Sequence, residues 1–156
     1  MRLATGTLLG TLALDQASKW AVVHWLDLQT RLVIEVVPPL LTFRMAWNYG
    51  VNFGLFAGDG AVTRWGLVAL ALAISVAIWV WARRERHNRA MQIGAGLLIG
   101  GALGNVADRI VYGAVADFIN MSCCGIDNPF AFNVADAAIF AGALLLIVFS
   151  GREKTP

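Results

Sequence analysis

Charged residues are scarce in this 156-residue chain, where Asp, Glu, Lys and Arg together make up 14% of the sequence. An ordinary soluble domain carries about 25% charged residues and about 45 to 50% apolar ones. Here 58% of the residues are hydrophobic and the mean hydropathy is +0.67. The apolar residues also gather in long blocks, whereas a soluble core would distribute them in stripes of period 2 or 3.6. The composition therefore predicts an integral membrane protein.

Cysteine and histidine are scarce too, with two residues of each type. Cys123 and Cys124 are adjacent, and adjacent cysteines rarely bridge each other and do not have the spacing of metal ligands. We expect them to have no functional role. His24 and His87 fall on opposite sides of the predicted membrane, which argues against a two-histidine metal or haem site. The sequence therefore predicts no metal and no cofactor.

Four apolar blocks are long enough to be considered as membrane spans, each of which needs about 20 residues. They cover approximately residues 3–25, 62–82, 91–111 and 132–149. Because Arg2 precedes the first block, that block could instead be a cleaved signal peptide, but Asp15, Gln16 and Lys19 occupy the place of a cleavage site. We expect a retained first span. The predicted fold is an all-α membrane protein in which residues 1–156 form one integral domain with four transmembrane helices.

The basic residues predict the orientation, because Lys and Arg are enriched in cytoplasmic loops. They cluster before the first block, between the second and third blocks, and after the fourth. These clusters contain Arg2; Arg83, Arg84, Arg86 and Arg89; and Arg152 and Lys154. Both termini are therefore predicted to be cytoplasmic, and segments 27–60 and 112–130 to face outward. The alternative of a nucleic-acid or nuclear-localisation signal for the central cluster is less favoured, because it lies between two apolar blocks.

The outer segment 27–60 contains two short runs typical of β-strands. Residues 32–37 are rich in Val and Ile and end at Pro38 and Pro39, and residues 40–47 form the second run. We expect a small extracytoplasmic β-sheet that lies on the membrane. Residues 53–56 combine aromatic and small side chains, so they are predicted to rest in the headgroup layer.

Polar side chains inside the apolar blocks are costly to insert, by about 2.5 to 3.5 kcal/mol for each charge, and are therefore candidates for function. They lie at helical spacing within each block. The three sets are Asp15 with Lys19, Asn105 with Asp108 and Arg109, and Asn133 with Asp136. At a rise of 1.5 Å per residue, the second and third sets lie near the outer surface. Asp117 follows the third block closely, so Asp117 and Asp136 are predicted to meet at the outer membrane boundary.

Two carboxylates held close together share one proton over a wide pH range. The ionised one can take a proton from water while the protonated one protonates the carbonyl oxygen or the leaving amine. This pair therefore indicates aspartic peptide hydrolysis. Structural alternatives remain: Asp108 with Arg109 and Asp15 with Lys19 as ion pairs, Asn105 and Asn133 as hydrogen bonds between helices, and Asp117 as an ordinary loop residue. A carboxylate-containing transporter or channel subunit is the alternative function, and a presenilin-like protease is disfavoured because the spans lack its Gly-x-Gly-Asp signature.

Five motifs, spread in order over nearly the whole chain, resemble those of signal peptidase II, the prolipoprotein signal peptidase family. They are residues 15–19 (DQASK), 48–54 (NYGVNFG), 100–109 (GGALGNVADR), 115–118 (VADF) and 132–136 (FNVAD). The resemblance implies an aspartic endopeptidase with Asp117 and Asp136 as its catalytic pair. Seven further positions match polar residues that the family places around that pair: Asp15, Lys19, Asn48, Asn105, Asp108, Arg109 and Asn133.

The resemblance also implies a substrate and a location. The family cleaves lipoprotein precursors on the amino side of a cysteine that carries a diacylglyceryl group. Membrane lipid and the precursor's signal peptide would then be the partners, with no nucleic acid involved and the chain acting as a monomer. The expected location is the bacterial inner membrane, with the active site on the periplasmic face. We further hypothesise that the glycine-rich face of the third block, from Gly94 to Gly104, either packs on a neighbouring helix or receives the signal peptide.

Overall fold

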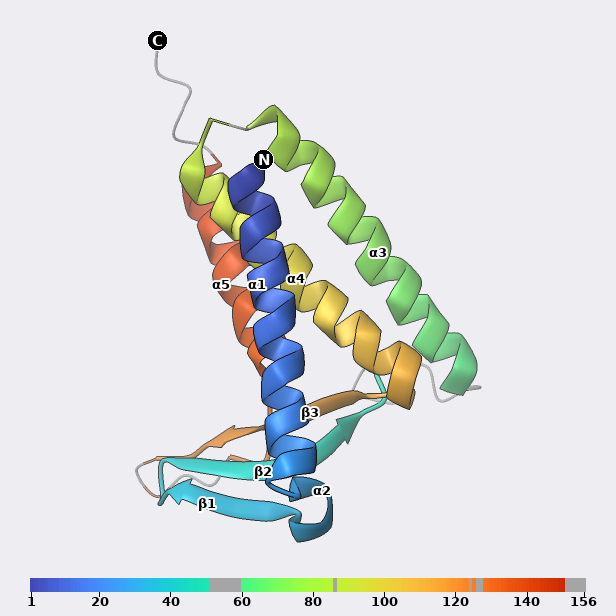
Figure 1. The fold of residues 1–156 in the computed structure, drawn as a ribbon, viewed down its shortest axis with the longest axis vertical. Helices are drawn as coiled ribbons and strands as arrows, with labels where there is room; N and C mark the ends of the chain where they lie inside the picture. Colours follow the sequence, from blue (N-terminus) through green and yellow to red (C-terminus); the bar gives the residue numbers. More distant parts are fainter. Residues whose placement is uncertain (51–59, 86, 124, 126–127, 151–156) are drawn as a thin grey trace.

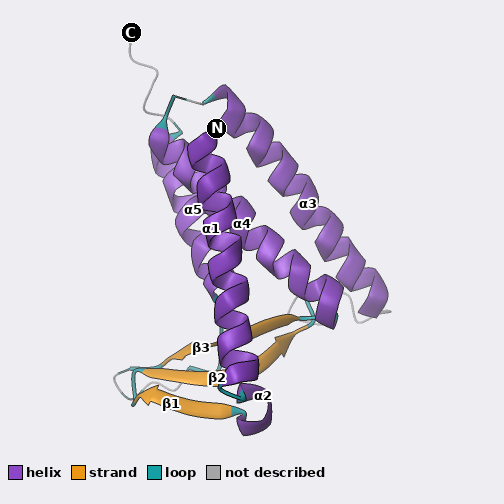
Figure 2. Cartoon of the chain, in the orientation of Figure 1, coloured by secondary structure: helices purple, strands orange, loops and turns teal. Residues whose placement is uncertain are grey.

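The described part of the chain contains four long helices, with a small sheet at one end of them (Figures 1 and 2). The structure is a computed structural model that describes residues 1–50, 60–85, 87–123, 125 and 128–150. The long helices are α1 (Arg2–Lys19), α3 (Gly60–Arg84), α4 (Arg89–Tyr112) and α5 (Val134–Phe149). The start of α1, the connection from α3 to α4 and the end of α5 lie together at the end opposite the sheet (Figure 1).

Helix α4 is the centre of the bundle because its glycines let two neighbouring helices approach closely. A Cβ atom added at Gly100 would lie 2.7 Å from the carbonyl oxygen of Leu8 in α1. One added at Gly101 would lie 2.5 Å from the carbonyl oxygen of Ala135 in α5. No side chain fits at such distances, so glycine is required at both positions. Of our two hypotheses for this face, packing on neighbouring helices is the one that the structure supports.

The termini of α4 are fixed by residues that suit helix ends. The side chain of Asn88 accepts a hydrogen bond of 3.1 Å from the Met91 amide, which caps the N-terminus. Gly113 ends the helix with φ +82°, a left-handed conformation that glycine adopts easily. This turn directs the chain from α4 directly into strand β3 (Val115–Met121).

Helix α3 packs mainly on α4 and is otherwise exposed, with Val68, Ser75 and Ala82 as its buried residues. Among the described residues, α3 and α4 are the two helices long and apolar enough to cross a membrane by length and composition. Helix α5 is apolar but has 16 residues. Helix α1 continues without a break into a π-helix, η1 (Trp20–Trp25), so that its helical path reaches the sheet.

The sheet contains the two predicted strands and a third that the sequence did not predict. Strands β1 (Val33–Val37) and β2 (Leu41–Asn48) form an antiparallel hairpin, preceded by the short helix α2 (Leu28–Arg31). Strand β3 pairs antiparallel with β2 on its other side, giving the order β1-β2-β3. We had expected segment 112–130 to be a loop. The prediction for residues 53–56 lies outside the described residues.

A small apolar core attaches the sheet to the end of the helical bundle. Val22 of η1, Leu28 of α2 and Phe118 of β3 are buried together. Phe43 of β2 contacts Phe118 edge to face, with 5.7 Å between the ring centroids. Because Phe118 is anchored in this core, the neighbouring Asp117 is held against the end of the bundle.

Candidate active site

Asp117 lies in β3, opposite Ala46 of β2, and its side chain is almost completely buried. Each of its carboxylate oxygens accepts a hydrogen bond from an asparagine amide. Asn133 Nδ2 donates to Oδ1 at 2.6 Å and Asn48 Nδ2 donates to Oδ2 at 3.1 Å. The sheet brings Asn48 here, because it ends β2 next to the start of β3.

Asp136 lies in the first turn of α5, where it forms a capping box with Asn133. The Asp136 amide donates to Asn133 Oδ1 at 2.8 Å, and the Asn133 amide donates to Asp136 Oδ2 at 3.3 Å. The other oxygen of Asp136 accepts from Asn105 Nδ2 of α4 at 2.9 Å. The spacing of Asn133 and Asp136 is therefore the local signal that starts α5 and also fixes this carboxylate.

Asn133 connects the two aspartates and is fully buried. Its Nδ2 atom donates to Asp117 and also contacts Asn105 Oδ1 at 3.2 Å, while its Oδ1 atom accepts from the Asp136 amide. Asp117 and Asp136 are therefore linked by a chain of hydrogen bonds through the side chains of Asn133 and Asn105. Sequence reasoning considered Asn105 and Asn133 as bonds between helices, and in the structure they also hold the carboxylates.

The environment of Asp117 favours its protonated form. Burial, followed by the negative charge of Asp136, raises the pKa of Asp117 from 3.8 to about 6. The hydrogen bonds from Asn48 and Asn133 and the charge of Lys19 act in the opposite direction. A carboxyl group with such a pKa can exchange protons near neutral pH, as general acid and base catalysis requires.

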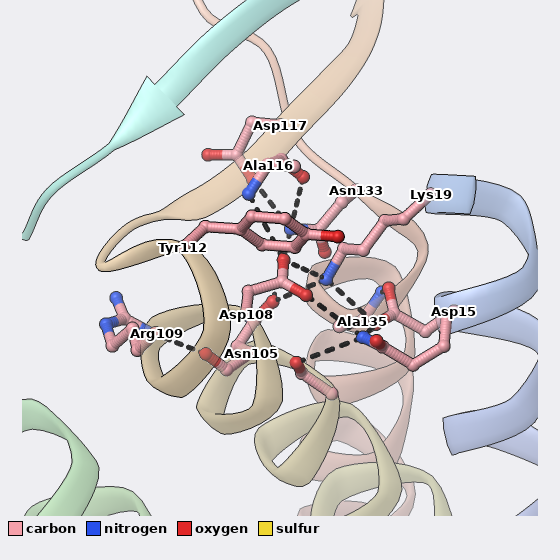
Figure 3. Close-up of polar contacts among 12 residues, drawn as sticks. Asp15, Lys19, Asn105, Asp108, Arg109, Tyr112, Ala116, Asp117, Asn133 and Ala135 are labelled. Carbon is pink, nitrogen blue, oxygen red and sulfur yellow. Dashed lines mark hydrogen bonds and ion pairs between the residues drawn. The ribbon is translucent and has the colours of Figure 1, made fainter. Parts of the chain in front are cut away.

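A second cluster of charges lies below Asp117 in the view of Figure 3 and is centred on Lys19 of α1. Its Nζ atom lies 2.8 Å from Asp15 Oδ2 and 2.8 Å from Asp108 Oδ2, and all three side chains are buried. Lys19 also donates to Asn105 Oδ1 at 3.2 Å. The expected pairing of Asp15 with Lys19 is confirmed.

Sequence analysis offered Arg109 as the structural partner of Asp108, and in the structure Asp108 forms a close ion pair with Lys19. Adjacent helical residues point in different directions, so Arg109 cannot follow Asp108 into the cluster. Arg109 donates to the carbonyl oxygen of Asn105 at 3.3 Å. It also interacts electrostatically with Asp117, Asp136 and, to a smaller extent, Asp108.

Arg109 and Asn105 face a cavity of about 250 Å³ between α3, α4 and α5. The rest of its lining is apolar and includes Leu67, Ile74 and Ile139. An apolar chain could occupy this space with its polar end toward the carboxylates. A larger depression of about 530 Å³ is lined by Glu35 and Arg44 of the sheet. Neither space is lined by Asp117 or Asp136, but the smaller one is lined by Asn105, which donates a hydrogen bond to Asp136.

Gln16 is the site residue that sequence reasoning missed. Its Nε2 atom donates to Asp108 Oδ1 at 3.0 Å, Asp15 Oδ2 at 3.2 Å and the Gly104 carbonyl at 3.3 Å. The available signal was a polar side chain inside an apolar block, on the turn between Asp15 and Lys19.

Among the described residues, no three His, Cys, Asp or Glu side chains are arranged to hold a metal ion.

Ionisable side chains gathered at one end of an apolar helical bundle are typical of the functional site of an integral membrane protein, and the two hydrogen-bonded aspartates are groups able to perform acid and base chemistry. Comparison with known proteins identifies the family. The model of the family described as Signal peptidase (SPase) II matches residues 7–151, and this chain belongs to that family.

Curated relatives agree over most of their length. The chain is 47% identical over 148 residues to the lipoprotein signal peptidase of Methylorubrum extorquens (strain PA1), covering 93% of this chain and 83% of the relative. It is 44% identical over 140 residues to that of Methylobacterium radiotolerans, covering 90% and 80%.

Two solved structures, both of a bacterial membrane enzyme studied by the in meso method, share the fold. The structure at 1.9 Å resolution has a TM-score of 0.82 and 25% identity, with 99% of this chain and 96% of that chain covered. The structure at 2.3 Å has a TM-score of 0.77 and 26% identity, with 100% and 95% covered.

Proposed function

We propose that this chain is an aspartic endopeptidase that removes the signal peptide from diacylglyceryl-modified prolipoproteins, cleaving on the amino side of the lipid-modified cysteine. The family and the names of the curated relatives support peptidase activity on lipoprotein precursors. The observation that carries the aspartic mechanism is the pair formed by the buried Asp117 and the partly buried Asp136, which are linked through the side-chain amides of Asn133 and Asn105. The transporter or channel alternative is not favoured, because the family is a peptidase.

In the proposed mechanism the pair binds one water molecule and holds one proton. The ionised carboxylate takes a proton from the water, whose oxygen attacks the scissile carbonyl, while the protonated carboxyl donates its proton to the carbonyl oxygen. The tetrahedral intermediate then collapses as a proton passes to the leaving amine. Asn48, Asn105 and Asn133 keep both carboxylates oriented, because each donates a hydrogen bond to one of them.

The proposed topology has four spans, approximately residues 3–25, 62–82, 91–111 and 132–149, with both termini cytoplasmic. It is supported by the arrangement of the elements, since the end of α3 with Arg83 and Arg84 and the start of α4 with Arg89 lie at one end of the bundle and the sheet at the other (Figure 1). Residues 27–60 and the catalytic segment 112–130 then face the periplasm, and residues 1–156 form one domain in the bacterial inner membrane.

Substrate binding follows from this topology. The cavity between α3, α4 and α5 is apolar except for Asn105 and Arg109, which lie on the side of the carboxylates. A signal helix or acyl chain from the bilayer could enter it, so that the scissile bond comes to lie near Asp117 and Asp136. The proposed partners are therefore the lipid-modified precursor and membrane lipid, and we propose that the chain acts as a monomer.

The test is to incubate the purified protein with lipidated and unlipidated forms of one precursor. The wild type should cleave the lipidated form alone, and Asp117→Asn and Asp136→Asn should each abolish cleavage while the protein still folds. Glu35→Gln is the matched control, because Glu35 is an exposed acid in β1 of the same outer region. Near-normal turnover in either aspartate variant would contradict the assignment.

A further inference from the structure

The cluster around Lys19 is linked to both proposed catalytic aspartates by the same kind of contact. Asp15 Oδ1 accepts a hydrogen bond of 2.9 Å from the amide of Ala135, the residue before Asp136. Asp108 Oδ2 accepts a hydrogen bond of 3.1 Å from the amide of Ala116, the residue before Asp117. Each supporting carboxylate thus holds the backbone directly next to one aspartate, and Lys19 joins the two supporting carboxylates.

We propose that Lys19 is a positioning residue that aligns Asp117 and Asp136 together, by fixing Asp15 and Asp108 so that each anchors the amide preceding one of them. This inference rests on the proposed function, because it assigns a role within the same site. In the described part of the chain, Lys19 forms no hydrogen bond or ion pair with either aspartate. It therefore positions them through two other side chains, and its charge acts on Asp117 only at longer range.

The geometry of α1 makes this arrangement rigid. Asp15 and Lys19 are one helical turn apart, so their ion pair is set by the helix itself. Asp15 also lies at the N-terminus of α5, where the helix dipole favours a negative charge. Ala116 and Ala135 are buried, so water does not replace these anchors.

The two aspartates lie on separate elements, which is why an alignment device matters. Asp117 belongs to strand β3 and Asp136 to helix α5, so the distance between them depends on how the sheet sits on the bundle. Within the described residues, Lys19 is the cation in ion pairs with Asp15 and with Asp108. If Lys19 were removed, Asp15 and Asp108 would remain buried without a cation, and their remaining hydrogen-bond donors would be Gln16 and the backbone amides of Ala135 and Ala116.

The charge of Lys19 also reaches Asp117 and provides an independent measurement. It lowers the pKa of Asp117, opposing burial and the charge of Asp136. Arg109 of α4 also interacts electrostatically with Asp117, and Asp108 binds the amide of Ala116 next to it. Asp15 and Asp108 are the charged groups that face Lys19 itself. Removing the ammonium should therefore move the pH profile as well as the turnover.

The test compares Lys19→Met with Gln92→Met in the full-length enzyme. Gln92 is also buried and donates a hydrogen bond of 2.9 Å to the Ala82 carbonyl, but it lies near the opposite end of α4. Both variants should lower the melting temperature. Lys19→Met alone should reduce kcat about 100-fold, the cost of a small misplacement of catalytic groups. KM should change by less than about twofold, because substrate contacts remain. The fall in activity at high pH, which we expect when the proton of Asp117 is lost, should move to higher pH.

A charge-free variant keeps the inference testable if Lys19→Met fails to fold. The triple variant Lys19→Met/Asp15→Asn/Asp108→Asn removes all three charges of the cluster, so that none of them is left buried without its partner. Its asparagine oxygens can still accept hydrogen bonds from the amides of Ala135 and Ala116. Neutral hydrogen bonds are about half as strong as charge-assisted ones, so kcat should still be reduced at least about tenfold. The triple variant should be no less active than Asp15→Asn/Asp108→Asn, because Lys19 acts through those two residues.

Two results would overturn the proposal. The first is a folded Lys19→Met or triple variant with wild-type kcat and an unchanged pH profile, which would leave Lys19 with a role in stability alone. The second is an additional loss of kcat when Lys19→Met is added to the double variant, which would show that Lys19 acts directly. A wild-type protein that cleaves no lipidated precursor would instead contradict the proposed function.

Discussion

The hydrogen bond from Asn48 to Asp117 gives a quantitative prediction about the pH dependence of cleavage. Burial and Asp136 raise the pKa of Asp117 to about 6, and the Asn48 hydrogen bond lowers it. If the pair must hold one proton to be active, kcat/KM should fall as the pH rises through about 6 and that proton is lost. Asn48→Ala removes a donor to the ionised form and should therefore move this limb to higher pH.

The size of the shift follows from the strength of the bond. Hydrogen bonds to charged groups contribute about 1.5 to 3 kcal/mol, and one pKa unit corresponds to about 1.4 kcal/mol. The Asn48 bond is 3.1 Å long and Asn48 is partly exposed, so we take the lower figure. The limb should move up by about one unit, to about pH 7.

The assay measures kcat/KM for a lipidated precursor from pH 4 to 9 in detergent or bicelles. Asn120→Ala is the matched control, because Asn120 is a buried asparagine in β3 that donates to the carbonyl oxygens of Asn128 and Phe130. It should lower stability and leave the limb in place. If Asn48→Ala left the limb unmoved or shifted it to lower pH, the assignment of that limb to Asp117 would be refuted.

Three further predictions concern stability and topology. The pKa of Asp117 is raised from the ordinary 3.8 to about 6 in the folded protein, so its contribution to stability is present below about pH 4 and lost as the pH rises through about 6. The loss is at most about 3 kcal/mol. Asp117→Asn should reduce this pH dependence of the melting temperature, and an unchanged dependence would contradict the reasoning. Gly101→Ala should destabilise the protein by about 1 to 3 kcal/mol, because the added Cβ would lie 2.5 Å from the carbonyl oxygen of Ala135. Gly66→Ala is the control and should be tolerated, because a Cβ at Gly66 meets nothing within 4 Å. Equal melting temperatures for the two variants would argue against the close packing of α4 on α5. In a background without Cys123 and Cys124, Glu35→Cys should react with an impermeant maleimide added outside spheroplasts and Arg84→Cys only after permeabilisation; the reverse pattern would invert the proposed topology.

The parts of the fold that could be predicted from the sequence depend on local pattern. Long apolar blocks predicted the regions where α1, α3, α4 and α5 occur. The run of β-branched residues and the two prolines predicted the β1–β2 hairpin. The Asn133 and Asp136 spacing predicted a shared helical face, which the structure realises as a capping box.

The parts that could not be predicted depend on contacts between distant residues. Strand β3 has no strict alternation of polar and apolar side chains, because its sequence is buried on both sides for most of its length. It becomes a strand by pairing with β2, where Asp117 lies opposite Ala46. The partner of Asp108 was equally hidden, since Lys19 is 89 positions away and the adjacent Arg109 was the nearer cation in sequence.

The scarcity of charge gives the site its chemistry. Four carboxylates meet there, from Asp15, Asp108, Asp117 and Asp136, against two cations, Lys19 and Arg109. Lys19 forms ion pairs with Asp15 and Asp108, which also accept hydrogen bonds from the backbone amides of Ala135 and Ala116. Asp117 and Asp136 receive asparagine amides, which are neutral donors and compensate a buried charge less completely. Burial and the neighbouring charge of Asp136 raise the pKa of Asp117, so Asp117 is well placed to bind a proton. Two carboxylates this close are costly to ionise together in a partly buried site. The excess of carboxylates over cations therefore favours a pair that keeps one proton, which is the proton that peptide hydrolysis needs.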